Sequence, residues 1–193
     1  MHIIAGLYKN RRLNTPKSNL TRPTSSKLRE SIFNICQHSI EDSVFLDLFA
    51  GSGAMGLEAL SRGASKALFV DVNRQAINCI KENVAQLKVE KQCEIFCGQV
   101  FALLKLFAKQ NRQFDFIYAD PPYNTSVDIM GQVFLYSEYV VHSLDSSHLL
   151  ALNGTLIVEE DARHPPKIAP THLVLEDSRK FGHSLIQIYK KIS

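Results

Sequence analysis

The feature that most constrains the fold is an alternation, from residue 44 onward, of short apolar runs with segments of helical periodicity. The apolar runs are continuous, as in strands buried on both faces of a sheet. Such strands alternating with helices are typical of a parallel α/β sheet, because each parallel connection needs a crossover. The predicted strands are 44–49, 66–71, 94–97, 114–119 and 155–159.

The clearest helical segment runs from about Arg74 to Lys88, with Asn73 placed to cap its start. Its apolar residues fall on one stripe, which an amphipathic helix would turn toward the core. That stripe consists of Ile77, Ile80, Val84 and Leu87.

The C-terminal part departs from this alternation. Two strand-like runs, 171–176 and 184–190, are separated only by the short segment D-S-R-K-F-G-H. This segment is too short for a crossover helix, so the two runs are predicted to pair antiparallel as a hairpin. The sheet would then have seven strands.

The N-terminal residues 1–22 are predicted to form a small basic β-hairpin extension, two short strands around a turn at Asn10, which tolerates a left-handed conformation. A helix is expected to begin at Pro23 and Thr24. Its inward residues would be Leu28, Ile32, Ile35 and Cys36. The remaining residues, 23–193, are predicted to be one domain.

Length and composition limit the class of protein. With 193 residues and 45% hydrophobic content, one core is expected. No run of about 18 apolar residues without a charge occurs, so a soluble, cytoplasmic protein without a membrane partner is expected. The four cysteines form no C-x-x-C pair and have no histidine at zinc-ligand spacing, which predicts reduced, mostly buried thiols and no metal site. They are Cys36, Cys79, Cys93 and Cys97.

The net charge of +3 is unevenly distributed. Residues 1–30 contain seven basic residues against Glu30 alone, a net charge of +6, so the other 163 residues carry −3. This basic segment is either a solvated face or a surface for the phosphates of a nucleic acid, and charge alone favours neither.

A glycine-rich turn follows the first predicted strand, in D-L-F-A-G-S-G-A-M-G (47–56). Gly51, Gly53 and Gly56 form G-x-G-x-x-G between a strand and a helix, and Asp71 ends the next strand, placed to bind ribose hydroxyls. This pattern alone would suggest a dinucleotide. Glycines in a tight turn also serve a purely structural purpose.

Asp47 distinguishes two cofactors. A carboxylate four residues before Gly51 would repel a phosphate bound at the turn and would favour a cationic ligand. S-adenosylmethionine carries a sulfonium and an ammonium group and no phosphate, so it fits better than NAD. The alternative for Asp47 is a cap or charge at a helix N-terminus. Gln99, after the third strand, could accept from the adenine amino group or simply face solvent.

The motif D-P-P-Y, from Asp120 to Tyr123, ends the fourth strand. Proline lacks an N–H, so the Asp120 carboxylate and the Pro121 carbonyl could both accept hydrogen bonds from one planar amino group and direct its nitrogen lone pair toward an electrophilic methyl. Tyr123 could stack on the ring carrying that amine. A base inside a helix cannot reach such a pocket, so the substrate would be single-stranded, looped or flipped out. The structural alternative is a turn that starts a helix.

These motifs together resemble a known family. D-L-F-A-G-S-G, F-V-D-V-N and A-D-P-P-Y resemble class I S-adenosylmethionine-dependent methyltransferases acting on exocyclic amines, with a Rossmann-like, mostly parallel sheet. A-G-L-Y-K-N-R-R-L, R-P-T-S-S-K-L-R-E-S-I-F-N and R-K-F-G-H resemble the RsmD family, and the resemblance runs from Ile3 to Tyr189. It implies methylation of a guanine N2 amine in 16S ribosomal RNA, within the assembled or assembling 30S subunit. The family turn R-x-G-R appears here as K-N-R-R, with Asn10 replacing glycine.

The residues and the resemblance together predict three sets of site residues. The cofactor set is Asp47, Phe49, Gly51, Ser52, Gly53, Asp71, Val72, Asn73, Gln99 and Val100. The amine-binding set is Asp120, Pro121, Pro122 and Tyr123. The RNA set is Lys9, Arg11, Arg12, Arg22, Thr24, Arg29, Arg179 and Lys180, of which Arg22, Thr24 and Arg29 would lie near the methionine end of the cofactor.

Three rival functions differ in what else they require. An adenine-N6 DNA methyltransferase uses the same D-P-P-Y but needs a further base-reading region, for which 193 residues leave little room. A protein glutamine methyltransferase would more typically have Asn in place of Asp120. A non-catalytic RNA-binding assembly factor would keep the basic segment but would have no reason to keep D-P-P-Y.

Overall fold

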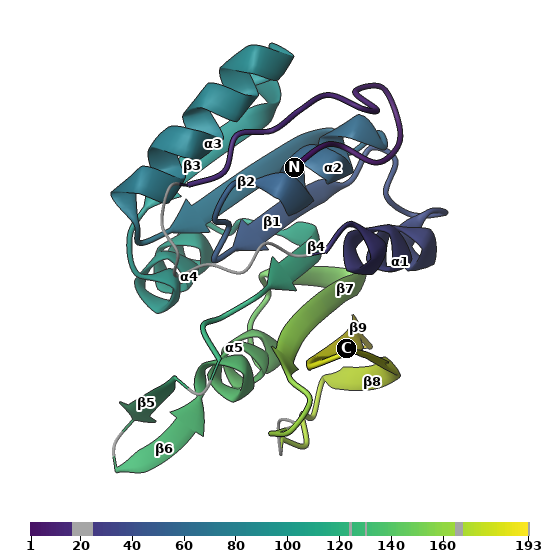
Figure 1. Ribbon diagram of the computed structural model, residues 1–193. Coiled ribbons are helices and arrows are strands. Elements are labelled where there is room, and N and C mark those ends of the chain that lie inside the picture. The colour runs from purple at the N-terminus through teal and green to yellow at the C-terminus, as the bar shows by residue number, and fades with distance from the viewer. Residues whose placement is uncertain (17–24, 124, 130, 165–167, 193) are drawn as a thin grey trace. The chain divides into compact units, whose positions relative to one another are not determined.

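The structure is a computed structural model that describes residues 1–16, 25–123, 125–129, 131–164 and 168–192. Seven strands form one sheet in the order β3-β2-β1-β4-β7-β9-β8, and a two-stranded sheet pairs β5 with β6 (Figure 1). The predicted mostly parallel sheet that ends in an antiparallel C-terminal hairpin is therefore confirmed. The chain divides into two compact units, residues 1–100 and 101–193.

The first unit contains three parallel strands. They are β1 (Val44–Leu48), β2 (Lys66–Asp71) and β3 (Cys93–Cys97). Val44 lies opposite Lys66 in β2, and Asp71 lies opposite Cys97 in β3. The apolar side chains of β1 and β2 are buried, which explains their continuous apolar runs.

Helices α1 (Ser26–Cys36), α2 (Ala54–Ser61) and α3 (Arg74–Leu87) complete the first unit, with a 3-10 turn at Glu90–Gln92. Ser25 caps α1, its side chain accepting from the Leu28 N–H; the predicted start at Pro23 and Thr24 lies outside the described residues. Asn73 caps α3 as predicted, accepting from the Gln75 N–H, and the whole predicted stripe of α3 is buried. In α1, Ile35 is only half-buried.

The N-terminal segment does not form the two predicted strands. In residues 1–16, a single isolated bridge joins His2 and Arg12, although Asn10 adopts the expected left-handed conformation (φ 66°). The reason is that neighbouring donors bind α2 instead: the N–H groups of Ile4 and Ala5 donate to the Glu58 carboxylate.

The same segment is packed into the first unit rather than extended from it. Ile3 and Leu13 are buried, and the Asn14 N–H donates to the Asn83 side chain on α3. Figure 1 shows this purple segment running past α2 and α3. The segment is thus held on both sides of its turn.

The second unit contains the remaining strands of the large sheet. They are β4 (Phe114–Ala119), β7 (Leu150–Asp161), β8 (Leu173–Phe181) and β9 (Ser184–Lys191). β4 pairs parallel with β7, whereas β9 pairs antiparallel with both β7 and β8.

The C-terminal hairpin is tighter than predicted. β8 runs to Phe181, so Arg179 and Lys180 are strand residues and not loop residues. Only Gly182 and His183 connect β8 to β9, and Gly182 has a positive φ of 62°, as the first position of a two-residue hairpin turn requires.

Two further elements of the second unit were not predicted as such. A short hairpin of β5 (Ser126–Ile129) and β6 (Gln132–Leu135) follows the D-P-P-Y loop. Its strands have only four residues each, too few for an apolar pattern to mark them as strands. Helix α4 (Val100–Lys109) spans the boundary of the two units, and α5 (Tyr136–Asp145) follows β6.

The cysteines only partly meet expectation. Cys36 and Cys79 are buried, Cys93 is half-buried and Cys97 is exposed, and all four are free thiols. Burial raises the pKa of the Cys93 thiol to about 12. Among the helices in the described part of the chain, none has the length and apolar character to cross a membrane.

Candidate active site

The glycine turn between β1 and α2 has an unusual backbone. Phe49, Gly51 and Gly53 all have positive φ, of 60°, 54° and 75°. The strain of a left-handed Phe49 is notable, because non-glycine residues rarely adopt it. The turn is held by a hydrogen bond from the Gly53 N–H to the Ala50 carbonyl (2.7 Å).

The three glycines of the motif serve different purposes. A Cβ built on Gly56 would lie 2.4 Å from the Phe69 ring, and one on Gly53 would lie 3.2 Å from Phe69 and Ile80. These two glycines let α2 pack closely on the sheet. A Cβ on Gly51 would meet no atom within 4 Å, so the backbone there borders open space that a ligand could approach.

Asp71 joins this turn to the start of α3. One carboxylate oxygen accepts from the Gly51 N–H and the other from the Asn73 N–H, both at 2.8 Å. The structure therefore brings together the turn and the acid that the sequence paired. Val72, next to Asp71, is 59% exposed although it is apolar.

The segment after β3 reaches the same edge of the first unit. The Gly98 N–H donates to the Asp71 carbonyl (3.0 Å), which places Gln99 near the end of β2. Gln99 is exposed, and Val100 is buried. All members of the predicted cofactor set therefore belong to the first unit.

Asp47 is only 1% exposed, and its carboxylate accepts from the Gly56 N–H in the first turn of α2 (3.0 Å). Burial raises the pKa of this carboxyl well above its usual range, and the nearby Asp71 raises it further, whereas the Gly56 hydrogen bond lowers it. These contacts match the alternative role that the sequence offered for Asp47, a cap at a helix N-terminus. Direct contact with a cofactor is a proposal.

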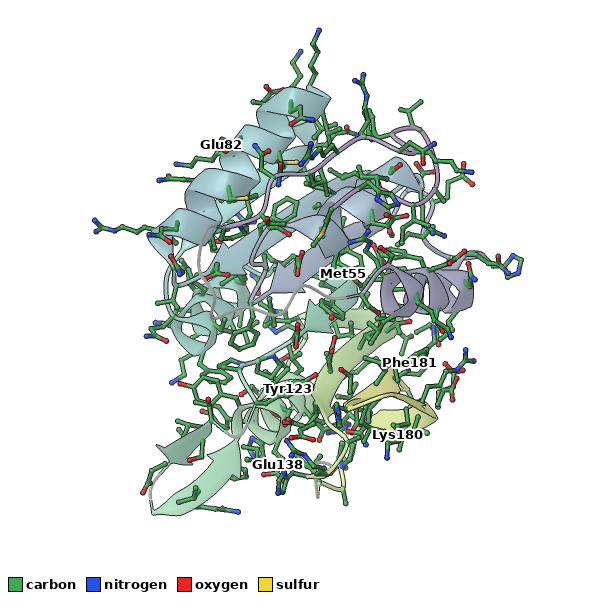
Figure 2. The ribbon with its side chains drawn as sticks, in the orientation of Figure 1. Met55, Glu82, Tyr123, Glu138, Lys180 and Phe181 are labelled. Atoms are coloured by element: carbon green, nitrogen blue, oxygen red, sulfur yellow. The ribbon has the colours of Figure 1, made fainter. Side chains whose placement is uncertain are left out.

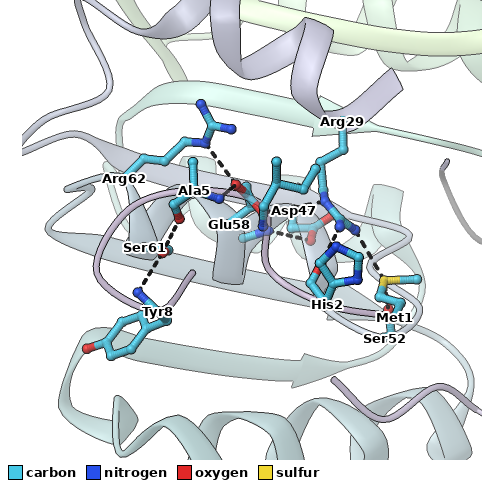
Figure 3. A network of polar contacts seen from close by, with 12 residues as sticks. Met1, His2, Ala5, Tyr8, Arg29, Asp47, Ser52, Glu58, Ser61 and Arg62 are labelled. Atoms are coloured by element: carbon cyan, nitrogen blue, oxygen red, sulfur yellow. Dashed lines mark hydrogen bonds and ion pairs between the residues drawn. The ribbon is translucent and has the colours of Figure 1, made fainter. Parts of the chain in front are cut away.

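A buried polar network lies beside the turn and was missed in the sequence (Figure 3). At its centre, Glu58 of α2 is fully buried and forms ion pairs with Arg62 (2.9 Å) and Arg29 (3.5 Å). The one signal that could have found it is a single acid within the otherwise small and apolar helix A-M-G-L-E-A-L.

This network corrects one prediction. Arg29 is 1% exposed and donates to the His2 carbonyl (2.5 Å), so it anchors the N-terminal segment and does not present its guanidinium to RNA. The sulfur of Met1 accepts from both Arg29 and the Ser52 hydroxyl. The chain's first residue thereby contacts the glycine turn.

The D-P-P-Y motif lies in the second unit, after β4. Asp120 is half-exposed, Pro121 is buried and Pro122 is exposed. Tyr123 is labelled in Figure 2. Its hydroxyl donates to the Glu159 carboxylate (2.8 Å) and also contacts the Ser184 hydroxyl (2.9 Å). Burial raises the pKa of Tyr123 well above its usual range, and the carboxylates of Glu159 and Asp120 raise it further against the opposing Ser184 hydrogen bond.

The remaining RNA candidates lie on exposed surface. Lys9, Arg11 and Arg12 are exposed near the turn of the N-terminal segment. In the C-terminal hairpin Lys180 is exposed, and Arg179 pairs with Asp177 at 2.7 Å. Arg22 and Thr24 lie outside the described residues. Across the described ranges, no group of three metal-ligating side chains could hold an ion.

Comparison with known proteins decides the family. The model of the family described as "Conserved hypothetical protein 95" matches residues 1–190. The chain belongs to this family. The resemblance to the RsmD family, inferred from the sequence motifs, is thereby confirmed.

Full-length relatives agree with this membership. The chain is 33% identical over 191 residues to the Bacillus subtilis protein YlbH, covering 99% of both chains. It is 32% identical over 192 residues to Ribosomal RNA small subunit methyltransferase D of Haemophilus influenzae, covering 98% of this chain and 93% of that one. The solved structure of Escherichia coli yhhF superposes with a TM-score of 0.83 at 27% identity, covering 100% of this chain and 98% of that chain.

Proposed function

We propose that this RsmD-family protein is an S-adenosylmethionine-dependent methyltransferase of small-subunit ribosomal RNA and that its target is the N2 amine of a guanine. The observation that carries the proposal is the pairing of the open glycine turn at Gly51 with the Asp71 carboxylate at the end of β2. The name of the Haemophilus influenzae relative supports the ribosomal substrate.

The residues of the first unit fit the proposed cofactor. The open space at Gly51 lets an adenosine approach the backbone, and Asp71 offers carboxylate oxygens to ribose hydroxyls. The exposed apolar Val72 offers a surface for the adenine, and Gln99 a polar partner for its amino group. The negative charge of Asp47, when ionised, favours the cationic methionine end over a phosphate.

When bound, S-adenosylmethionine supplies an electrophilic methyl group on a sulfonium. Asp120 and the Pro121 carbonyl hold the two protons of the guanine amino group, which keeps the nitrogen lone pair directed at that methyl. This orientation would let the amine accept the methyl group, with release of one amine proton and of the demethylated cofactor. Tyr123 stacks on the base, which is single-stranded or flipped out of its helix.

The decisive experiment is radiolabelled methyl transfer to 30S subunits from a strain that lacks this protein, followed by mapping of the modified base. Naked 16S RNA, double-stranded DNA and subunits from the parent strain are the comparison substrates. We expect label on one guanine N2 of the deficient subunits and none on subunits that are already modified.

Other outcomes would favour the rival functions. Label on adenine N6 in DNA would identify a DNA methyltransferase. Binding to subunits without any transfer, at saturating cofactor, would identify a non-catalytic assembly factor and overturn the proposal.

A further inference from the structure

Glu159 is a buried carboxylate at the end of β7 that binds two tyrosines. It is 5% exposed, and its two oxygens accept from the hydroxyls of Tyr118 and Tyr123, each at 2.8 Å. Tyr118 lies on β4 and Tyr123 lies in the D-P-P-Y loop that follows it. One carboxylate thus ties the end of a strand to the loop after it.

The next two acids of β7 have other partners. Glu160 accepts from the Ser137 hydroxyl on α5, and Asp161 pairs with Arg163. Among these three successive carboxylates, Glu159 is the one that accepts a hydrogen bond from the D-P-P-Y loop in the described residues. A buried carboxylate is costly unless hydrogen-bonded, so its two phenol donors provide the compensation.

We propose that Glu159 is a positioning residue that fixes the ring of Tyr123 through its hydroxyl, and thereby sets the plane on which the target base stacks. This inference rests on the proposed function. It adds a residue outside D-P-P-Y that acts on the base only through Tyr123.

The chemistry of the contacts explains how the ring is fixed. The single phenolic proton of Tyr123 goes to Glu159, so the Ser184 hydroxyl donates to the phenol oxygen. Hydrogen bonds to partners on two strands restrain rotation of the side chain. The prolines before Tyr123 already restrict the backbone, so the hydroxyl contacts limit the freedom that is left.

The raised pKa of Tyr123 is consistent with this arrangement. A phenol that stays protonated well above neutral pH remains a hydrogen-bond donor throughout the range in which cells work. The contact with Ser184, at the start of β9, also links the loop to the hairpin that carries Arg179 and Lys180. RNA held by that hairpin would therefore contact the same structural unit as the stacking ring.

The test is a double-mutant cycle on kcat and KM for 30S methylation. Tyr123→Phe keeps the ring and removes the hydroxyl, whereas Glu159→Leu removes the acceptor. We expect each to lower kcat/KM roughly tenfold, the effect of losing one hydrogen bond to a charged group, and the double variant to be no worse than either. Affinity for S-adenosylmethionine should be unchanged.

Two further variants separate positioning from stability. Glu159→Gln keeps an acceptor and should recover part of the lost activity, which also covers the case in which Glu159→Leu does not fold. Tyr189→Phe is the matched control, because Tyr189 is a buried tyrosine of β9 whose hydroxyl donates to Gln187. It should lower the melting temperature without changing kcat/KM.

The possible results are distinct. If the wild-type protein methylates and Tyr123→Phe and Glu159→Gln are both as active as it, the positioning role is wrong and the proposed function stands. Additive losses in the double variant would also overturn the role, because two residues acting through one contact cannot add. If the wild-type protein transfers no methyl group to any guanine, the proposed function fails, and this inference fails with it.

Discussion

The two candidate site motifs of this protein, the glycine turn and the D-P-P-Y loop, are held in place in different ways. In the first unit, backbone N–H groups at the glycine turn and after β2 bind two carboxylates: Gly51 and Asn73 donate to Asp71, and Gly56 donates to Asp47. In the second unit, the D-P-P-Y loop is held by side chains, through the Tyr123 hydroxyl and its contacts with Glu159 and Ser184.

This difference explains why the sequence reveals the hydrogen-bond partner of the glycine turn but not those of the D-P-P-Y loop. A turn whose backbone N–H groups bind a carboxylate needs glycine and an acid at fixed spacing, and both appear together in the sequence. A loop held by side chains depends on residues of distant strands. Glu159 and Ser184 are 36 and 61 positions away from Tyr123, so no local pattern connects them.

The largest expected effect concerns Asp120. It tests whether the D-P-P-Y loop acts on the substrate without contributing to cofactor binding. Asp120→Ala removes an acceptor for the amine, and we expect a loss of roughly 100-fold or more in the rate of 30S methylation, with cofactor affinity nearly unchanged. Single-turnover rates and calorimetric titration with S-adenosylmethionine measure the two quantities. Asp115→Ala, on the same strand, is the control and should retain activity. A fully active Asp120→Ala variant would reduce D-P-P-Y to a structural turn.

The basic residues of the two units allow a direct comparison of RNA binding. Replacing Lys9, Arg11 and Arg12 by Ala should flatten the slope of log affinity against log salt by roughly 2 to 3, through lost counterion release. The matched variant replaces Lys81, Lys105 and Lys109, which are also exposed and carry the same charge. Filter binding of subunits at several salt concentrations gives the slopes.

If both triple variants have the wild-type slope, the N-terminal segment is only a solvated face. The C-terminal hairpin then becomes the candidate, and Arg179→Ala with Lys180→Ala should flatten the slope instead. Cofactor affinity should stay the same in every one of these variants.

A smaller effect is expected at Asp71, which supports the backbone and which we propose also binds the cofactor. Asp71→Ala should weaken S-adenosylmethionine binding by about tenfold and also lower the melting temperature, because the Gly51 and Asn73 N–H groups lose their acceptor.

In the wild-type protein, S-adenosylmethionine at about 100 times its Kd should add about 2.7 kcal/mol to the free energy of unfolding. Equal stabilisation by NADH would contradict the choice of cofactor.

The smallest effect concerns Asp47, whose replacement by Asn should maintain or raise stability but weaken cofactor binding. Its folded-state pKa lies above the unfolded value, so its contribution to stability is full below the unfolded pKa and is lost as pH rises through the folded pKa. Asp47→Asn keeps an acceptor for the Gly56 N–H and removes this loss. At neutral pH the variant should therefore be at least as stable as the wild type.

The same substitution should weaken S-adenosylmethionine binding a few-fold, because it removes the negative charge that we propose favours the cationic end of the ligand. Thermal unfolding across the acid-to-neutral range and calorimetric titration measure both effects. A variant that is less stable at neutral pH, or that binds the cofactor more tightly, would contradict this account of Asp47.

The sequence by itself determined the strands of the large sheet, the cap and stripe of α3, and the pairing of the glycine turn with Asp71. These features rest on local physics: continuous apolar runs, helical periodicity, and the few residues that a tight turn or a helix start accepts. For the same reason it predicted the left-handed Asn10. The family motifs then extended the prediction from the fold to the chemistry.

Only the tertiary structure decided which charged side chains face solvent and which support the sites. Arg29 belongs to a basic segment in the sequence, yet it is buried against Glu58, and the same carboxylate accepts from the Ile4 and Ala5 N–H groups of the N-terminal segment. Glu159 is one of three successive acids in the sequence, and the fold places two tyrosine hydroxyls within hydrogen-bond distance of its carboxylate. Such long-range partners are set by how strands align in three dimensions, and this alignment leaves no periodic signal in the chain.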